Sequence, residues 1–327
     1  MTQRTKVQAP AETEATDTVT GVNALLVPCA IGHPSTDPLP TFVLSGGGNL
    51  GALQVGMLYA LVERGIRPGM IVGTSVGAIN GAFLASRSDL LGIREIARLW
   101  SSLRRRDVLG VNVTTLIGGL LGRRGHLFDA VPIRQLLESF LDFRELEEAP
   151  VPLAVVATAL ADGEPVVLDS GDATTALLAS SAVPGILPAV EIDGRMLVDG
   201  AAAADTPVRE AVSLGARNLY VLPTVPLQVA RLVAQLSSDG HGDRAALPTV
   251  RILPPPDLHI PLGDLGQSRR LLELGYDQAR AWLDARPLPS PPRCLANDEG
   301  RAVPEAGRST MPRRPARAPV CPRAMHS

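Results

Sequence analysis

Lysine and aromatic residues are scarce in this sequence. Lys6 is the single lysine, so arginine supplies almost all of the positive charge, and the formal net charge is -2. Domains that bind nucleic acid are usually strongly basic, so this charge argues against a nucleic acid partner. Aromatic side chains make up 3% of the residues, and the core must therefore be built from aliphatic side chains and alanine.

Cysteine is scarce as well. The three cysteines are Cys29, Cys294 and Cys321, and their wide spacing matches no zinc-binding pattern. We therefore expect no disulfide framework and no metal site, and no other motif indicates a cofactor.

The N-terminal residues do not contain the basic segment followed by an apolar one that a secretory signal requires. Residues 39–62, 68–86 and 173–190 are uncharged runs with the length of a transmembrane helix. Glycine, proline or polar residues interrupt each run where a turn would lie, so we interpret the runs as buried strand-turn-helix segments. We expect a cytoplasmic protein, with peripheral contact as its closest approach to a membrane.

Composition divides the chain into three regions. Residues 1–38 predict a disordered leader, and residues 286–327 predict a disordered tail rich in proline and arginine, because neither contains the periodic apolar residues of a core. The basic tail is either an electrostatic arm for an anionic membrane or an inert extension. Residues 39–285 are predicted to form one folded domain.

Strand-like and helix-like segments alternate through this domain. Residues 41–44 predict a strand, residues 49–64 a helix with Asn49 as its N-cap, and residues 70–72 a second strand. Strands that alternate with helices indicate an α/β fold with a mostly parallel central sheet covered on both faces. One antiparallel hairpin is expected around residues 193–194, where Asp-Gly suits a type I′ turn.

A serine motif follows the second strand. Residues 73–77 read Gly-Thr-Ser-Val-Gly, a G-x-S-x-G between a predicted strand and a predicted helix. This context is typical of a nucleophile elbow, in which Ser75 lies on a sharp turn and Gly73 and Gly77 leave space for that turn. The N-terminus of the following helix favours a developing anion at the same place.

A glycine turn follows the first strand. Gly46, Gly47 and Gly48 stand in a row, which suits a backbone whose N–H groups approach a ligand closely. In acyl transfer that ligand is the oxyanion of the tetrahedral intermediate. A right-handed crossover from the first strand to the second places both turns at the carboxyl edge of the sheet. We therefore expect the glycine turn and Ser75 to face one cleft.

The same glycines also allow a dinucleotide-binding interpretation. Gly46, Gly48 and Gly51 fit the fingerprint G-x-G-x-x-G. That fingerprint expects an acidic residue at the end of the next strand, where this sequence continues through Thr74 to Ser75. The pattern therefore favours the oxyanion turn.

A carboxylate ends a later strand. Asp199 follows the predicted strand 196–198 and precedes Gly200 and Ala201. An Asp-Gly pair after a strand is usually only a turn, and this pair gains its weight from the two motifs that accompany it.

The three motifs resemble those of the patatin-like phospholipases in order and in separation. Residues 179–188, 207–211 and 214–216 are also similar to the family's segments on either side of the aspartate motif. The resemblance covers roughly residues 40–223. It implies a three-layer α/β/α fold with a mostly parallel sheet, and lipid acyl hydrolase activity on an acyl-ester substrate.

Carried onto this sequence, the resemblance implies Ser75 as nucleophile and Asp199 as base. It implies the backbone N–H groups of Gly46, Gly47 and Gly48 as the oxyanion donors.

Two positions depart from the family pattern. Leu50 stands where the glycine motif usually has a basic residue, which removes a partner for a phosphate or an oxyanion. Asp205 precedes Thr206 and Pro207 where the family usually has Asn before Pro, a change expected to alter a loop and to leave the chemistry in place.

Three functions are compared below. In the leading one, Asp199 takes the proton of Ser75 directly, as a Ser-Asp dyad. The first alternative is a histidine-dependent α/β-hydrolase that uses His241 or His259. The second is a nucleotide-binding or scaffold protein that kept the fold and lost catalysis.

One further segment has two interpretations. The apolar, glycine-rich residues 108–121 predict either an interfacial lid over an acyl groove or a buried helix.

Overall fold

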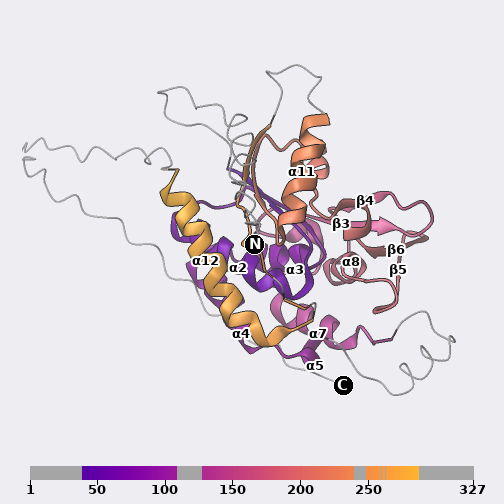
Figure 1. Cartoon of the computed structure of the whole chain (residues 1–327). Coiled ribbons are helices and arrows are strands. Elements are labelled where there is room, and N and C mark those ends of the chain that lie inside the picture. The colour runs from indigo at the N-terminus through magenta and orange to yellow at the C-terminus, as the bar shows by residue number, and fades with distance from the viewer. Residues whose placement is uncertain (1–38, 109–126, 239–247, 259, 262, 287–327) are drawn as a thin grey trace, which may run out of the picture. The chain divides into compact units, whose positions relative to one another are not determined.

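The computed structural model describes residues 39–108, 127–238, 248–258, 260–261 and 263–286, which are coloured in Figure 1. The predicted leader, the segment beyond Val108 that was predicted as a lid or a buried helix, and the predicted tail beyond Arg286 lie outside the described residues. All five histidines, His241 and His259 among them, and the three cysteines also lie outside them.

An eight-stranded sheet forms the centre of the fold. Its strands follow the order β5-β6-β3-β2-β1-β7-β8, and β4 pairs with β3. The parallel strands are β1 (Thr41–Leu44), β2 (Met70–Thr74), β3 (Leu153–Ala159), β7 (Asn218–Leu222) and β8 (Thr249–Ile252). The antiparallel strands are β4 (Pro165–Leu168), β5 (Val190–Ile192) and β6 (Arg195–Asp199). The predicted mostly parallel sheet is confirmed, and Asp193 and Gly194 both have the positive φ of a type I′ turn.

Helices cover both faces of this sheet (Figure 1). One face carries α2 (Gly51–Glu63), α3 (Val76–Ser86), α4 (Leu90–Ser102), α7 (Val131–Phe140), α8 (Ala173–Ser180) and α12 (Ser268–Asp284). The other face carries α10 (Val208–Ser213) and α11 (Pro226–Ser238). The short elements are η1 (Gly48–Leu50), α5 (Arg105–Val108), η2 (Leu146–Glu148), α9 (Ala201–Ala204) and η4 (Leu265–Gln267). The fold is therefore α/β with three layers, as expected.

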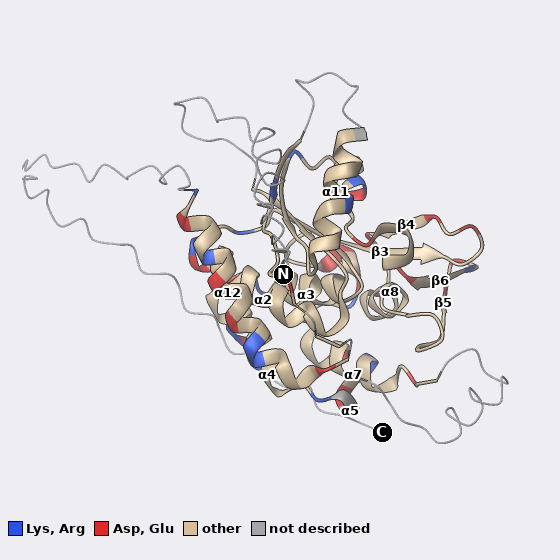
Figure 2. Cartoon of the chain, in the orientation of Figure 1, with Lys and Arg blue, Asp and Glu red and all other residues tan. Residues whose placement is uncertain are grey.

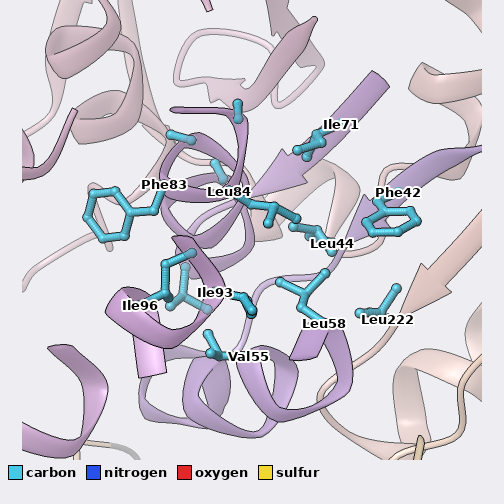
Figure 3. Packing of buried hydrophobic residues seen from close by; sticks show 14 of the residues in the cluster. Phe42, Leu44, Val55, Leu58, Ile71, Phe83, Leu84, Ile93, Ile96 and Leu222 are labelled. Carbon is cyan, nitrogen blue, oxygen red and sulfur yellow. The ribbon is translucent and has the colours of Figure 1, made fainter. Parts of the chain in front are cut away.

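The strand sequences explain the two helical layers. Successive side chains of a strand point to opposite faces, so Phe42 and Leu44 lie in the larger apolar cluster and Val43 lies in the smaller one. Figure 3 shows the larger cluster, which these β1 side chains share with Leu58 of α2 and Ile93 of α4. Because both faces are covered, the central strands are mostly apolar, and the threonines in them are buried.

Charged residues are absent from β1, β2, β3 and α3, and many lie on the outer helices α4 and α12 (Figure 2). The uncharged runs at 39–62 and 68–86 form β1 with α2 and β2 with α3, as predicted. Among the described residues, no helix combines the length and the apolar character needed to cross a bilayer.

β3 brings the ends of β2 and β6 together. β4 and β6 both pair with Ala157 and Thr158 of β3, so they lie on opposite edges of that strand. β2 and β4 both pair with Val155 and Val156 of β3, so these two strands also lie on opposite edges. Since β2 and β6 are each opposite β4, they lie along the same edge of β3. The register pairs Thr74 with Val156 and Asp199 with Ala157. The carboxyl ends of β2 and β6 therefore meet end to end.

The start of α2 differs from the prediction, which placed Asn49 at the N-cap. Asn49 lies in η1, α2 begins at Gly51, and no side chain caps the helix. The carboxamide of Asn49 instead donates to the carbonyl oxygens of Pro261 and Asp264 and accepts from the N–H of Gly263. The predicted N-cap is therefore wrong, because backbone groups far along the chain satisfy this side chain.

The helices α2 and α12 approach each other at two glycines. A Cβ at Gly56 of α2 would overlap the carbonyl oxygen of Leu272, and one at Gly275 of α12 would overlap that of Leu53. Glycine inside a helix is destabilising relative to alanine. Close packing of the two backbones explains why glycine is present at both positions.

We predict that Gly275→Ala lowers the free energy of unfolding by about 2 kcal/mol, because the added methyl group forces the helices apart. Arg270→Ala, on the exposed face of the same helix, is the control and should stay within about 0.5 kcal/mol of the parent. Urea denaturation measures both values, and a Gly275→Ala variant as stable as the parent would contradict this packing.

Candidate active site

Ser75 lies on a strained turn between β2 and α3. Its backbone has φ 53° and ψ -125°, a conformation that residues other than glycine rarely adopt. Two glycines allow the turn: a Cβ at Gly73 would lie 2.6 Å from the Cα of Ala78, and one at Gly77 would overlap the carbonyl oxygen of Leu44. The strand, the sharp turn and the helix lie where the G-x-S-x-G motif predicted them.

A direct hydrogen bond joins the serine and the aspartate. Oγ of Ser75 donates to Oδ2 of Asp199 at 2.6 Å, and the two residues are only 8% and 5% exposed. The other carboxylate oxygen, Oδ1, accepts from the N–H of Ala201 at 2.8 Å. Gly200 lets the chain turn tightly here, because a Cβ would overlap the carbonyl oxygen of Val156. The turn after β6 therefore directs the carboxylate at the hydroxyl.

Burial controls the protonation of two carboxyl groups in this region. It raises the pKa of Asp199, while the hydrogen bond from Ser75 acts in the opposite direction and the negative charge of Asp205 adds to the rise. Burial also raises the pKa of Asp205, against the effects of the Gln228 amide and the Arg231 charge. A carboxylate with a raised pKa is a stronger base than an exposed one, which suits removal of a hydroxyl proton.

The glycine turn lies directly against Ser75. A Cβ on Gly46 would lie 3.6 Å from the Cβ of Ser75. The N–H of Gly46 donates to the carbonyl oxygen of Asp205 at 3.0 Å, and the N–H of Ser75 donates to Oγ of Ser180 at 2.8 Å. Both of these backbone donors are therefore already occupied.

The next two glycines differ from Gly46 in this respect. Within the described part of the chain, the N–H groups of Gly47 and Gly48 donate to no acceptor. Their φ angles are 154° and 56°, values that favour glycine. Of the three predicted donors, the structure thus leaves Gly47 and Gly48 available for a ligand.

Two buried glutamines hold the glycine turn from opposite layers of the fold. Gln54 of α2 donates to the carbonyl oxygens of Ser45 at 3.2 Å and Leu222 at 2.9 Å. Gln228 of α11 donates to the carbonyl oxygen of Gly46 at 3.0 Å. Successive carbonyl groups of the turn are thus bound by side chains that lie on opposite faces of the sheet.

A chain of buried side chains extends this support to α4. Asn80 of α3 donates to Oε1 of Gln54 at 3.1 Å and accepts from Nε1 of Trp100 at 2.9 Å. Gln54, Asn80 and Trp100 belong to none of the predicted motifs, although carboxamides inside otherwise apolar helices are a visible signal. Thr224 and Gln228 gave no such signal, because they lie beyond the motifs and contact the turn only in the folded chain.

A protein-family model matches the part of the chain that contains the three motifs of this site. The model that describes patatin-like phospholipases matches residues 42–212, which is more than half of the chain. The chain belongs to the patatin-like phospholipase family. The match includes the glycine turn, Ser75 and Asp199, and it ends before Thr224 and Gln228.

Two curated proteins are similar to this chain in sequence. The chain is 31% identical over 183 residues to an uncharacterized NTE family protein of Mycobacterium bovis. This match covers 56% of this chain and 48% of that protein. The chain is also 31% identical over 188 residues to Lysophospholipase NTE1 of Candida glabrata. That match covers 55% of this chain and 10% of the fungal protein. This chain therefore spans about half the length of the mycobacterial relative and a tenth of the fungal one.

Solved structures similar to this patatin-like chain have low sequence identity to it. VipD from Legionella pneumophila has a TM-score of 0.48 and 15% identity, and the match covers 77% of this chain and 68% of VipD. Human GIVD cytosolic phospholipase A2 has a TM-score of 0.47 and 12% identity, with 80% of this chain and 61% of that chain covered.

We predict that Asp199→Asn raises the free energy of unfolding at pH 7, because it removes a buried charge. The folded-state pKa of Asp199 lies above its ordinary value of 3.8. Below pH 3.8 the carboxyl group is protonated in both the folded and the unfolded chain, so its ionisation costs the folded state nothing. Above the raised pKa it is ionised in both, and the full cost of a buried charge lowers the stability. The stabilisation should therefore shrink as the pH is lowered toward 3.8.

Urea denaturation of the parent and of Asp199→Asn at several pH values tests this prediction. A gain in stability that is the same at pH 4 and at pH 7 would contradict it.

Proposed function

We propose that this protein is a serine hydrolase that cleaves carboxylic esters of lipid-like substrates through Ser75 and Asp199. The observation that carries the proposal is the 2.6 Å hydrogen bond between two buried side chains, one of them on a strained strand-to-helix turn. Its membership of the patatin-like phospholipase family and its similarity to a protein named lysophospholipase support lipid esters as the substrate class.

The reaction follows from the positions of these groups. Oδ2 of Asp199 takes the proton as Oγ of Ser75 forms a bond to the carbonyl carbon of the ester, and the carbonyl oxygen becomes an oxyanion. The alcohol then leaves with the proton from Asp199, and Ser75 carries the acyl group. Water attacks this acyl-serine, with Asp199 again accepting and returning a proton, and the carboxylic acid is released.

Gly47 and Gly48 are the proposed oxyanion donors. The N–H groups of Gly46 and Ser75 are already bonded to Asp205 and to Ser180, whereas those of Gly47 and Gly48 are available. Backbone donors that are held in place before the reaction commonly provide a large part of the reduction in barrier height. The N-terminus of α3 adds partial positive charge on the Ser75 side.

The direct contact also favours the dyad over a histidine-dependent mechanism. In a catalytic triad an imidazole stands between the serine and the carboxylate. Here the two side chains are bonded to each other at 2.6 Å, which leaves no space between them for a third group. The same site argues against the non-catalytic alternative, a nucleotide-binding or scaffold protein. A buried carboxylate and a strained serine both lower the stability of the fold, and a protein without catalysis gains nothing from them.

We predict that Ser75→Ala and Asp199→Ala each lower the turnover of acyl esters by at least about a thousandfold, because each removes an essential partner in bond formation. Alanine substitutions of His241 and His259 are the controls and should retain activity. Hydrolysis of a panel of lipid and short-chain esters provides the measurement, and a fluorophosphonate probe should label the parent at Ser75. Full activity in Asp199→Ala would rule out the dyad, whereas loss of activity in a histidine variant would favour the triad.

We predict that Asp205→Asn moves the acid limb of the pH profile of kcat/KM to lower pH. The negative charge of Asp205 raises the pKa of Asp199, so its removal lets Asp199 ionise at lower pH. Asn keeps an oxygen that can accept the hydrogen bond from Gln228, which leaves loss of charge as the main change. The charge of Arg231, which lowers the pKa of Asp205, is present in both proteins. An acid limb at the same pH in the parent and the variant would contradict this coupling.

A further inference from the structure

The carbonyl oxygen of Gly46 accepts two hydrogen bonds from buried side chains. Oγ1 of Thr224 donates to it at 2.6 Å, and Nε2 of Gln228 donates to it at 3.0 Å. Thr224 is 2% exposed and Gln228 is 4% exposed. A carbonyl oxygen has two lone pairs, so these two donors determine the direction of the group and leave it no freedom to rotate.

The direction of this carbonyl group determines the direction of the next N–H. A trans peptide is planar, and its C=O and N–H bonds point in opposite directions. The described residues contain no cis peptide bond. Thr224 and Gln228 bind the Gly46 side of the peptide, and the N–H of Gly47 therefore points away from both of them.

Thr224 also explains why residue 47 is glycine. A Cβ at Gly47 would overlap Oγ1 of Thr224 and would lie 2.8 Å from its Cβ. The threonine therefore packs directly against the backbone of the turn, in addition to its hydrogen bond with Gly46. A side chain at position 47 would displace the hydroxyl group from the carbonyl oxygen.

Gln228 links this peptide to two other segments around the site. Its Oε1 accepts from the N–H of Thr224 at 2.6 Å, and its Nε2 also donates to Oδ1 of Asp205 at 2.9 Å. Asp205 in turn binds the N–H of Gly46 through its carbonyl oxygen. The amide group of Gln228 is thus fully used, and it joins the glycine turn, the loop after β6 and the start of α11.

We propose that Thr224 and Gln228 are positioning residues of the oxyanion site, which orient the peptide between Gly46 and Gly47 so that its N–H points at the substrate; this rests on the function proposed above. Neither side chain needs to touch the substrate. Their effect is to keep one donor in place before the oxyanion forms, which is when a fixed donor contributes most to catalysis. Both residues lie beyond the part of the chain that the family model matches.

The test compares Thr224→Val with Thr224→Ser. Valine keeps the shape and loses the hydroxyl group, whereas serine keeps the hydroxyl group and loses a methyl group. We expect Thr224→Val to lower kcat roughly tenfold to a hundredfold, less than the loss of an oxyanion donor itself, with KM changed by less than about twofold. Thr224→Ser should recover most of the activity. Thr174→Val, which changes a buried threonine at the opposite end of α8 from Ser180, is the control for loss of a buried hydroxyl group.

A second measurement separates positioning from a general loss of structure. Ser75 adds to the carbonyl carbon of a trifluoromethyl ketone, its proton passes to Asp199, and the ketone oxygen becomes an oxyanion in the same site. The inhibition constant of a lipid-like trifluoromethyl ketone should rise by the same factor as kcat falls in Thr224→Val. The inhibition constant of the matching methyl ketone, which does not add, should be unchanged. Gln228→Met, which removes the amide hydrogen bonds from Gln228 to Gly46 and to Asp205 at similar side-chain volume, should show the same pattern.

Each outcome is decisive for the inference. Equal kcat in Thr224→Val and the parent would overturn it, and so would an equal loss in Thr224→Val and Thr224→Ser, because packing alone would then explain the effect. Either result, in a parent with turnover that depends on Ser75, leaves the proposed function intact. Absence of Ser75-dependent turnover in the parent would overturn both proposals.

Discussion

The hydrogen bond between Ser75 and Asp199 depends on one edge of β3. Strand β2 runs parallel to β3 and β6 runs antiparallel to it, and their last residues pair with Val156 and Ala157. The ends of the two strands therefore meet, and the turns that follow present a hydroxyl and a carboxylate to each other. A slip of one residue in either register would turn the side chains to the opposite face of the sheet. Strand pairing thus determines the distance on which the proposed chemistry depends.

The site combines several arrangements that are unfavourable by themselves. Ser75 has a backbone conformation that is strained for any residue with a side chain, and burial of Asp199 makes its ionisation costly. The surrounding layers of aliphatic side chains, together with hydrogen bonds that bind the successive carbonyl groups of the glycine turn, hold these groups in place. Strain and buried charge at a site of this kind are consistent with the trade between stability and activity that enzymes commonly show.

The sequence predicted the parts of this protein that depend on local chemistry. Gly73 and Gly77 mark a sharp turn because the chain passes too close to its neighbours there for a side chain. Asp-Gly predicted the β5-β6 hairpin for a different reason, because both residues adopt the positive φ of the turn. The prediction for Asn49 was wrong because its partners, around Pro261, lie far along the chain, and local capping rules take no account of them. The disordered leader at residues 1–38 and the tail beyond Arg286 remain predictions, as do the two alternatives, lid or buried helix, for the segment beyond Val108.

By itself the sequence determined the alternation of strands and helices, the apolar core, and the serine and glycine motifs, because each is a property of neighbouring residues. The aspartate became a candidate through its order after those two motifs. The tertiary structure alone decided which backbone N–H groups are occupied and which are available, since Asp205, Ser180 and Gln228 reach the site from other elements. It also decided that the serine and the aspartate bond directly. A hydrogen bond between residues 124 positions apart depends on sheet register and packing, and the types of the two bonded residues determine neither.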